Sequence, residues 1–64
     1  MKYKVGDKVR ILNTKDTSGN PDGIPMMNEM IGQVFPIEAV YQVQVSIKGW
    51  LWNEHNIELV EKTK

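Results

Sequence analysis

The sequence predicts an all-β fold, a small barrel of five short strands, and three observations predict it. The chain has 64 residues, which is room for one hydrophobic core and a single domain, residues 1–64. Apolar and polar residues alternate over several short stretches, with the period of two that is typical of half-buried strands. Clusters of glycine, proline, asparagine and aspartate separate these stretches, as turns do between strands.

The first strand is predicted over residues 3–12. Its apolar side chains are Val5, Val9 and Ile11, and the charged residues between them give one face to the core and one to water. Gly6-Asp7 interrupts the alternation and predicts a turn or a bulge that redirects the chain.

Residues 13–31 lose the alternation and predict a long loop. The run Asn20-Pro21-Asp22-Gly23 is a strong turn signal, because proline suits the second position of a β-turn. A loop of this length in so small a domain is either functional or held by its own side chains. Met27 and Met30 have helical spacing, which predicts a short helical turn that lays methionines over an open end of the core. The alternative is a flexible contact surface lined with methionine.

The second and third strands are predicted over residues 32–40 and 41–47. Pro36 lacks the N–H that a central strand needs, so the second strand requires an edge position or a bulge at this proline. The third strand alternates most clearly, and its apolar residues share one face that is expected to be buried: Tyr41, Val43, Val45 and Ile47.

The last two strands are predicted over residues 50–52 and 57–60. Between them, residues 53–56 predict a 3₁₀ turn capped by Asn53. The residues after 60 are expected to fray. On this pattern we expect an SH3-like barrel, with a long loop after the first strand and a short helical or 3₁₀ turn before the last.

Composition limits the possible partners. Lysine and arginine together number 8, aspartate and glutamate number 8, and the net charge is zero, whereas proteins that bind nucleic acid through its phosphates are usually basic. With no cysteine and one histidine, neither a disulfide nor a metal site is expected, and no cofactor is expected. The sequence shows no signal peptide and no apolar run of about 18 residues, so we expect a cytoplasmic protein without membrane association.

Three stretches resemble known small barrels. Residues 4–11 (KVGDKVRI) are similar to the opening strand of SH3-like, KOW-like and Mind bomb-type barrels. Residues 27–34 (MNEMIGQV) resemble small bacteriophage and prophage barrels, in which a methionine precedes the glycine that opens the second strand. Residues 52–60 (WNEHNIELV) resemble their closing segment, although Leu59 stands where proline is usual. The resemblance implies an SH3-like fold and a peptide-binding or host-interaction role.

The leading hypothesis is therefore a non-enzymatic protein-interaction module, an accessory phage or prophage protein that binds a host protein. Its binding surface is expected to combine the 13–31 loop with these side chains: Trp50, Trp52, Tyr41, Tyr3, Met27 and Met30. The alternative is that the aromatic residues only cap a small barrel. The chain is expected to be a monomer or a weak homo-oligomer.

A second class of function is nucleic-acid binding through a KOW-like basic and aromatic face, with these basic residues: Lys4, Lys8, Arg10 and Lys48. Catalysis is not expected, because His55 and Glu54 have no nucleophile or second base at a suitable spacing. Calcium binding is not expected either, since Asp16, Asp22 and Glu29 lack the spacing of an EF-hand loop.

The direction of the tryptophans depends on the turn at Lys48-Gly49. A two-residue turn pairs Ile47 with Trp50 and directs both tryptophans into the core. A three-residue turn that ends at the glycine pairs Ser46 with Trp50 instead, which directs Leu51 inward and both tryptophans outward. We expect the three-residue turn, because the shorter one needs a positive φ at lysine and places two indoles in a small core.

Overall fold

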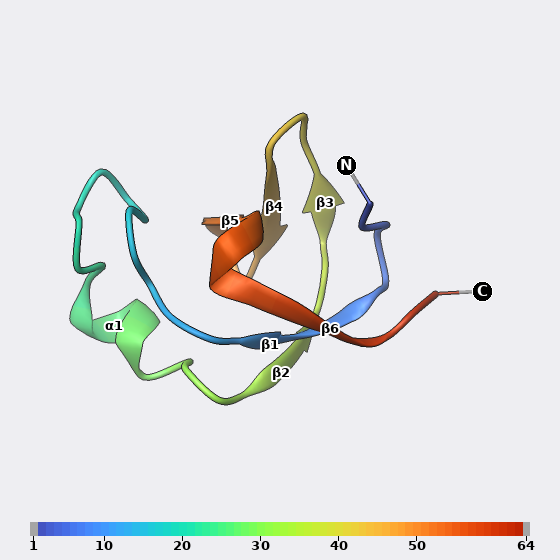
Figure 1. Ribbon diagram of the computed structural model, residues 1–64, viewed down its shortest axis with the longest axis horizontal. Helices are drawn as coiled ribbons and strands as arrows, with labels where there is room; N and C mark the ends of the chain where they lie inside the picture. Colours follow the sequence, from blue (N-terminus) through green and yellow to red (C-terminus); the bar gives the residue numbers. More distant parts are fainter. Residues whose placement is uncertain (1, 64) are drawn as a thin grey trace.

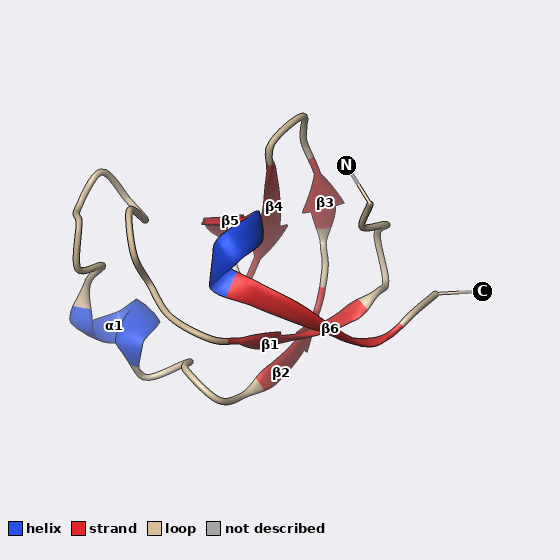
Figure 2. Cartoon of the chain, viewed as in Figure 1, coloured by secondary structure: helices blue, strands red, loops and turns tan. Residues whose placement is uncertain are grey.

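The fold is all-β. In the computed structural model, which describes residues 2–63, six strands form two three-stranded antiparallel sheets, with the orders β2-β1-β6 and β3-β4-β5 (Figure 1). The strands are β1 (Lys8–Ile11), β2 (Val34–Pro36), β3 (Ala39–Val40), β4 (Gln44–Ile47), β5 (Trp50–Asn53) and β6 (Ile57–Glu61). A four-residue helix, α1 (Pro25–Asn28), lies in the long loop, and a 3₁₀ turn (Glu54–Asn56) connects β5 to β6 (Figure 2).

The first strand is shorter than expected, because β1 begins at Lys8. The chain turns at Gly6, whose φ of +94° lies in the region that glycine adopts without strain. This turn separates Val5 from the strand, and Val5 is exposed on the surface. Val9 and Ile11 lie beyond the turn and are fully buried, as expected of the inward face.

The expected second strand is divided into β2 and β3, so the prediction of five strands is wrong. The division follows Pro36, which ends β2 and cannot donate a ladder hydrogen bond. The chain then passes from the first sheet to the second, because the Ile37 N–H donates to the Asp7 carbonyl at 2.9 Å and the Glu38 N–H to the Ser46 carbonyl at 2.8 Å. The described strands form two sheets and not one closed sheet, and the buried Ile37 belongs to the core that they share.

The expected third strand is also shorter, because β4 begins at Gln44. Val40 of β3 pairs with Val45 of β4, and the N–H of Tyr41 donates to the carbonyl of Gln44 at 2.8 Å. The chain therefore reverses within the stretch that alternation assigned to the strand. Tyr41 and Val43 lie at this reversal and are exposed, so the prediction that both face the core is wrong.

The turn at Lys48-Gly49 has two residues, with φ values of +55° and +80°. Ile47 pairs with Trp50 and Val45 pairs with Trp52. The expected three-residue turn, with Leu51 inward and the tryptophans outward, is therefore wrong. Leu51 is 46% exposed, whereas Trp52 is fully buried and Trp50 is half-buried.

The two-residue turn is favoured because burying Trp52 stabilises the fold by more than the positive φ of Lys48 costs. A positive φ costs a lysine about 1–2 kcal/mol, whereas losing a buried tryptophan typically costs about 3–5 kcal/mol. The indole N–H of Trp52 also finds a partner, because it donates to the carbonyl of Ile47 at 3.2 Å. The buried core thus extends across both sheets and the helix, and comprises Tyr3, Val9, Ile11, Met27, Ile37, Val45, Ile47, Trp52 and Ile57.

The long loop is held by its own side chains. Met27 of α1 is fully buried, which confirms the prediction of a short helical turn that covers the core with methionine. The hydroxyl of Ser18 donates to the Met27 sulfur at 3.3 Å. Thr14 and Thr17 are buried, and the Thr17 hydroxyl donates to the Thr14 carbonyl at 2.7 Å.

The closing segment follows the prediction except at its end. The 3₁₀ turn and β6 are confirmed, although the cap bond runs from the Asn53 N–H to the Asn56 side-chain oxygen, at 2.8 Å. The expected frayed tail is wrong up to Thr63, because Glu61 belongs to β6 and the Thr63 N–H donates to the Asp7 carboxylate at 2.6 Å. Lys64 lies outside the described residues.

Candidate functional site

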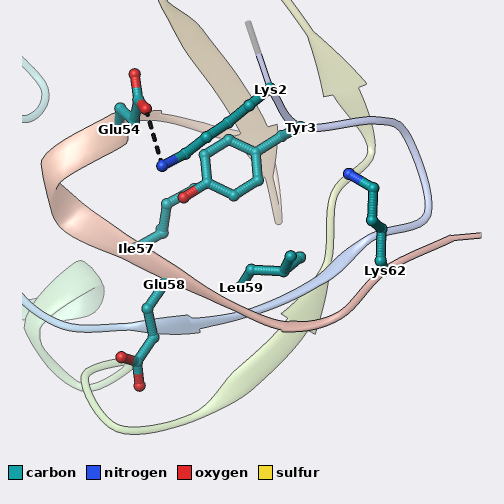
Figure 3. Close-up of a pocket in the computed structure, with 7 residues that line it drawn as sticks. All are labelled: Lys2, Tyr3, Glu54, Ile57, Glu58, Leu59 and Lys62. Atoms are coloured by element: carbon teal, nitrogen blue, oxygen red, sulfur yellow. Dashed lines mark ion pairs between the residues drawn. The ribbon is translucent and has the colours of Figure 1, made fainter.

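A pocket of about 320 Å³ lies between the N-terminal segment and β6 (Figure 3). It is formed by chain segments more than 50 residues apart, residues 2–3 on one side and residues 54–62 on the other. Its lining residues are Lys2, Tyr3, Glu54, Ile57, Glu58, Leu59 and Lys62. We call it the β6 pocket.

The wall of the β6 pocket is apolar. Tyr3 and Ile57 belong to the core cluster and are nearly fully buried. Leu59 lies two residues after Ile57 and therefore on the same face of β6, since side chains alternate along a strand. Leu59 is 44% exposed, so it is the part of the apolar wall that a bound group can cover.

Three of the four charged residues that line the β6 pocket have ion-pair partners. The Lys2 ammonium lies 3.3 Å from the Glu54 carboxylate and 5.4 Å from the centre of the Tyr3 ring. Glu58 points away from Tyr3 and accepts a hydrogen bond from the Arg10 guanidinium at 2.9 Å (Figure 3). Lys62 forms no ion pair with any residue in the range 2–63. Its positive charge lies at the rim of the pocket, where it also helps to lower the pKa of the Asp7 carboxyl.

Asp7 joins the two walls of the pocket. Its carboxylate accepts the N–H of Thr63 at 2.6 Å and the N–H of Lys4 at 3.0 Å. Lys4 follows Tyr3 and Thr63 follows Lys62, so one buried side chain holds both chain segments. The Thr63 N–H lowers the pKa of the Asp7 carboxyl below its ordinary value, aided by the Lys4 N–H, although burial acts in the opposite direction.

The structure does not bring the predicted aromatic and methionine residues to one surface. Three of them are buried in the core, namely Trp52, Tyr3 and Met27. Trp50 and Met30 are half-buried and pack against that core. Tyr41 is 55% exposed, but it precedes the start of β4, whereas Trp50 pairs with the end of β4. Their role in binding a partner stays a prediction, and of the six only Tyr3 lines the β6 pocket.

The predicted basic residues are also dispersed, and acidic residues lie beside two of them. Arg10 pairs with Glu58, and Lys8 lies opposite Glu61 in the register of β1 and β6. The Lys48 ammonium lies 5.6 Å from the centre of the Phe35 ring of β2. Lys4 is exposed in the N-terminal segment. Nucleic-acid binding stays a prediction that this arrangement does not favour.

His55 is exposed on the 3₁₀ turn. In the part of the chain that the structure describes, no three histidine, aspartate or glutamate side chains gather where they could hold a metal ion. Nor does any helix within residues 2–63 have the length and apolar character needed to cross a membrane.

Sequence reasoning missed most of the β6 pocket. Of its seven lining residues only Tyr3 is among the predicted site residues, although the alternation of Ile57, Glu58 and Leu59 places Leu59 on the inward face. No pattern in the sequence indicates that the N-terminal segment lies against β6. Comparisons with known proteins add no further site: no family model, curated protein or solved structure matches the chain.

Proposed function

We propose that this chain is a non-enzymatic protein-interaction module that binds its partner at the β6 pocket. One observation carries the proposal: the pocket combines an accessible apolar wall at Leu59 with the cation of Lys62, which forms no ion pair within residues 2–63. An exposed apolar patch with a charged rim is typical of a surface that binds another molecule. The predicted aromatic surface supports this role less well, because three of its six members are buried in the core.

The proposal keeps the expected setting, an SH3-like barrel that serves as a phage or prophage accessory protein in the cytoplasm. The two small antiparallel sheets, the long loop after β1 and the 3₁₀ turn before β6 support the barrel. The phage origin rests on the resemblance of residues 4–11, 27–34 and 52–60 alone.

Affinity capture from a lysate of the source organism tests the binding site. Leu59→Asp should abolish capture of the partner, since it places a carboxylate on the apolar wall. Leu51→Asp is the matched control, because Leu51 is a strand leucine of nearly equal exposure, 46% against 44%, on the outer face of the other sheet. Circular dichroism must show that both variants fold. Identical captured proteins for the wild type and both variants would rule out the β6 pocket as the binding site.

A further inference from the structure

Within the described residues, one edge of β6 has no partner strand. β6 is the outer strand of the β2-β1-β6 sheet, and β1 is its one neighbour there. At the start of this ladder the Leu12 N–H donates to the Asn56 carbonyl at 2.7 Å. Backbone groups of an antiparallel strand point alternately toward and away from the neighbour, so those of Ile57 and Leu59 point away from β1.

Three of these outward backbone groups are available. The N–H of Ile57 donates to the carbonyl of Glu54 and is satisfied. The carbonyl of Ile57 and the N–H and carbonyl of Leu59 have no hydrogen-bond partner among residues 2–63. They lie along the same strand whose inward side chains form the wall of the β6 pocket.

We propose that the β6 pocket and this free edge together bind an extended acidic peptide segment of another protein, which adds to the sheet as a fourth, antiparallel strand. The inference rests on the proposed function and deepens it by naming the kind of partner and its binding mode. The peptide residue opposite Leu59 exchanges two backbone hydrogen bonds with it. A third bond joins the peptide to the Ile57 carbonyl.

The pocket determines the first specificity position. Side chains of directly opposed residues lie on the same face of an antiparallel pair, so the peptide side chain opposite Leu59 enters the β6 pocket and contacts Leu59 and Tyr3. These neighbours are apolar, and the pocket of about 320 Å³ accommodates one aliphatic side chain. The peptide therefore carries leucine, isoleucine or valine at this position.

Lys62 determines the second position. In an antiparallel pair, the peptide residues that precede the aliphatic one lie beside the C-terminal end of β6, where Lys62 projects. Because Lys62 has no ion-pair partner in the described chain, an aspartate or glutamate two or three residues before the aliphatic residue complements it.

A second copy of this chain fits the edge less well than such a peptide. Antiparallel self-pairing that sets Ile57 opposite Leu59 would place Glu58 against its own counterpart, and like charges directly opposed are destabilising. Self-pairing centred on Leu59 would form a single hydrogen-bonded pair of residues. The β1–β6 ladder has a bulge where its register shifts between Lys8 and Val9, and this bulge prevents regular pairing of the β6 residues after Leu59. Charges and a bulge are also the features by which edge strands avoid pairing with copies of themselves.

The test is selection from a display library of random nine-residue peptides against the folded wild-type chain. The expected consensus is an acidic residue followed, two or three positions later, by an aliphatic residue. Lys62→Glu should weaken the selected peptide about three- to tenfold and shift a repeated selection toward basic residues. Lys15→Glu is the control, because it makes the same change of net charge at an exposed loop position.

Backbone methylation tests the added strand. An N-methyl group at the aliphatic residue removes a backbone donor and should weaken binding at least about tenfold. An N-methyl group on the next residue, whose N–H points away from β6, should change it less than about threefold. Equal tolerance of both methyl groups would overturn strand addition, while a loss of binding in Leu59→Asp and not in Leu51→Asp would leave the proposed function intact.

The other outcomes separate the two proposals as well. No enriched peptide, or a consensus without acidic residues, would overturn this inference, whereas capture from the lysate tests the proposed function independently. Selected peptides that bind Leu59→Asp as tightly as the wild type would overturn both. A homodimer in sedimentation that Leu59→Asp dissociates would overturn the inference by showing that a second copy occupies the edge.

Discussion

The indole of Trp52 determines the register of the β4–β5 hairpin. It is fully buried, pairs across the sheet with Val45 and donates its N–H to the Ile47 carbonyl. A shift of one residue would exchange Trp52 with Leu51 and expose the larger side chain. The positive φ of Lys48 is the local cost of keeping the indole inside. At this position packing outweighs backbone preference.

Fluorescence of single-tryptophan variants checks this register. Trp50→Phe leaves only Trp52, whose emission should be strongly blue-shifted and nearly insensitive to iodide, because its indole has no solvent exposure. Trp52→Phe leaves only Trp50, which is half-buried and should be quenched more readily. Equal quenching of the two folded variants would contradict the two-residue turn.

A local pattern predicted the strands only where tertiary packing agreed with it. Alternation placed Val45, Ile47, Val9 and Ile11 correctly on the core side. It also assigned Tyr41 and Val43 to the same strand, but nothing in the alternation reveals that the chain reverses between Val40 and Gln44. Pro36 was recognised as a defect in the second strand, yet whether a proline causes a bulge or a change of sheet depends on residues distant in sequence.

At the scale of elements, the long loop after β1 behaves as a packed unit. The Thr14 hydroxyl contacts the side chain of Asn28 and lies 3.1 Å from the carbonyl oxygen of Asp22, so it links the turn before α1 to the last residue of α1. Gly23 has a φ of +71° and lies directly against Thr14. Glycine is required there for two reasons: a Cβ would collide with Thr14, and the positive φ strains any other residue.

Alanine substitutions of two loop glycines separate these two requirements. Gly19→Ala should cost about 1–2 kcal/mol, since Gly19 has a φ of +68° but no atom within 4 Å of an added Cβ. Gly23→Ala should cost about 1–3 kcal/mol more, the usual range for overpacking, because its Cβ would lie 2.5 Å from the Thr14 Cβ. Urea unfolding measures both free energies, and equal losses would show that the loop does not pack tightly at Thr14.

At the scale of the whole molecule, the candidate site depends on the meeting of the two ends of the chain. The sequence predicted the inward face of β6 through Ile57, and it placed Tyr3 among the binding residues. It could not predict that Tyr3 and Lys62 belong to one pocket, because their proximity follows from a hydrogen bond between Asp7 and Thr63, 56 positions apart. A contact between residues so far apart in the chain produces no local periodicity in the sequence.

The same contact makes the stability of the molecule depend on pH. Hydrogen bonds from the Thr63 and Lys4 N–H groups hold the pKa of the Asp7 carboxyl below its ordinary value. A carboxyl whose pKa is lower in the folded state than in the unfolded state stabilises the fold fully above its ordinary pKa. That stabilisation is lost as the pH falls through the folded-state pKa.

We therefore expect Asp7→Asn to be less stable than the wild type near neutral pH, and the difference to shrink between about pH 5 and pH 2. Asparagine retains one acceptor for the two N–H groups but carries no charge, so its hydrogen bonds are weaker and do not titrate. Urea unfolding at a series of pH values measures the difference, and Asp16→Asn, at an exposed loop carboxylate, controls for the loss of one negative charge. In the wild type, hydrogen exchange of the Thr63 amide should quicken in acid relative to the intrinsic exchange rate of an unfolded chain, because the bond that protects it weakens when Asp7 is protonated. A stability difference that stays constant from neutral to acid pH would show that the Asp7 charge does not hold the two ends of the chain together.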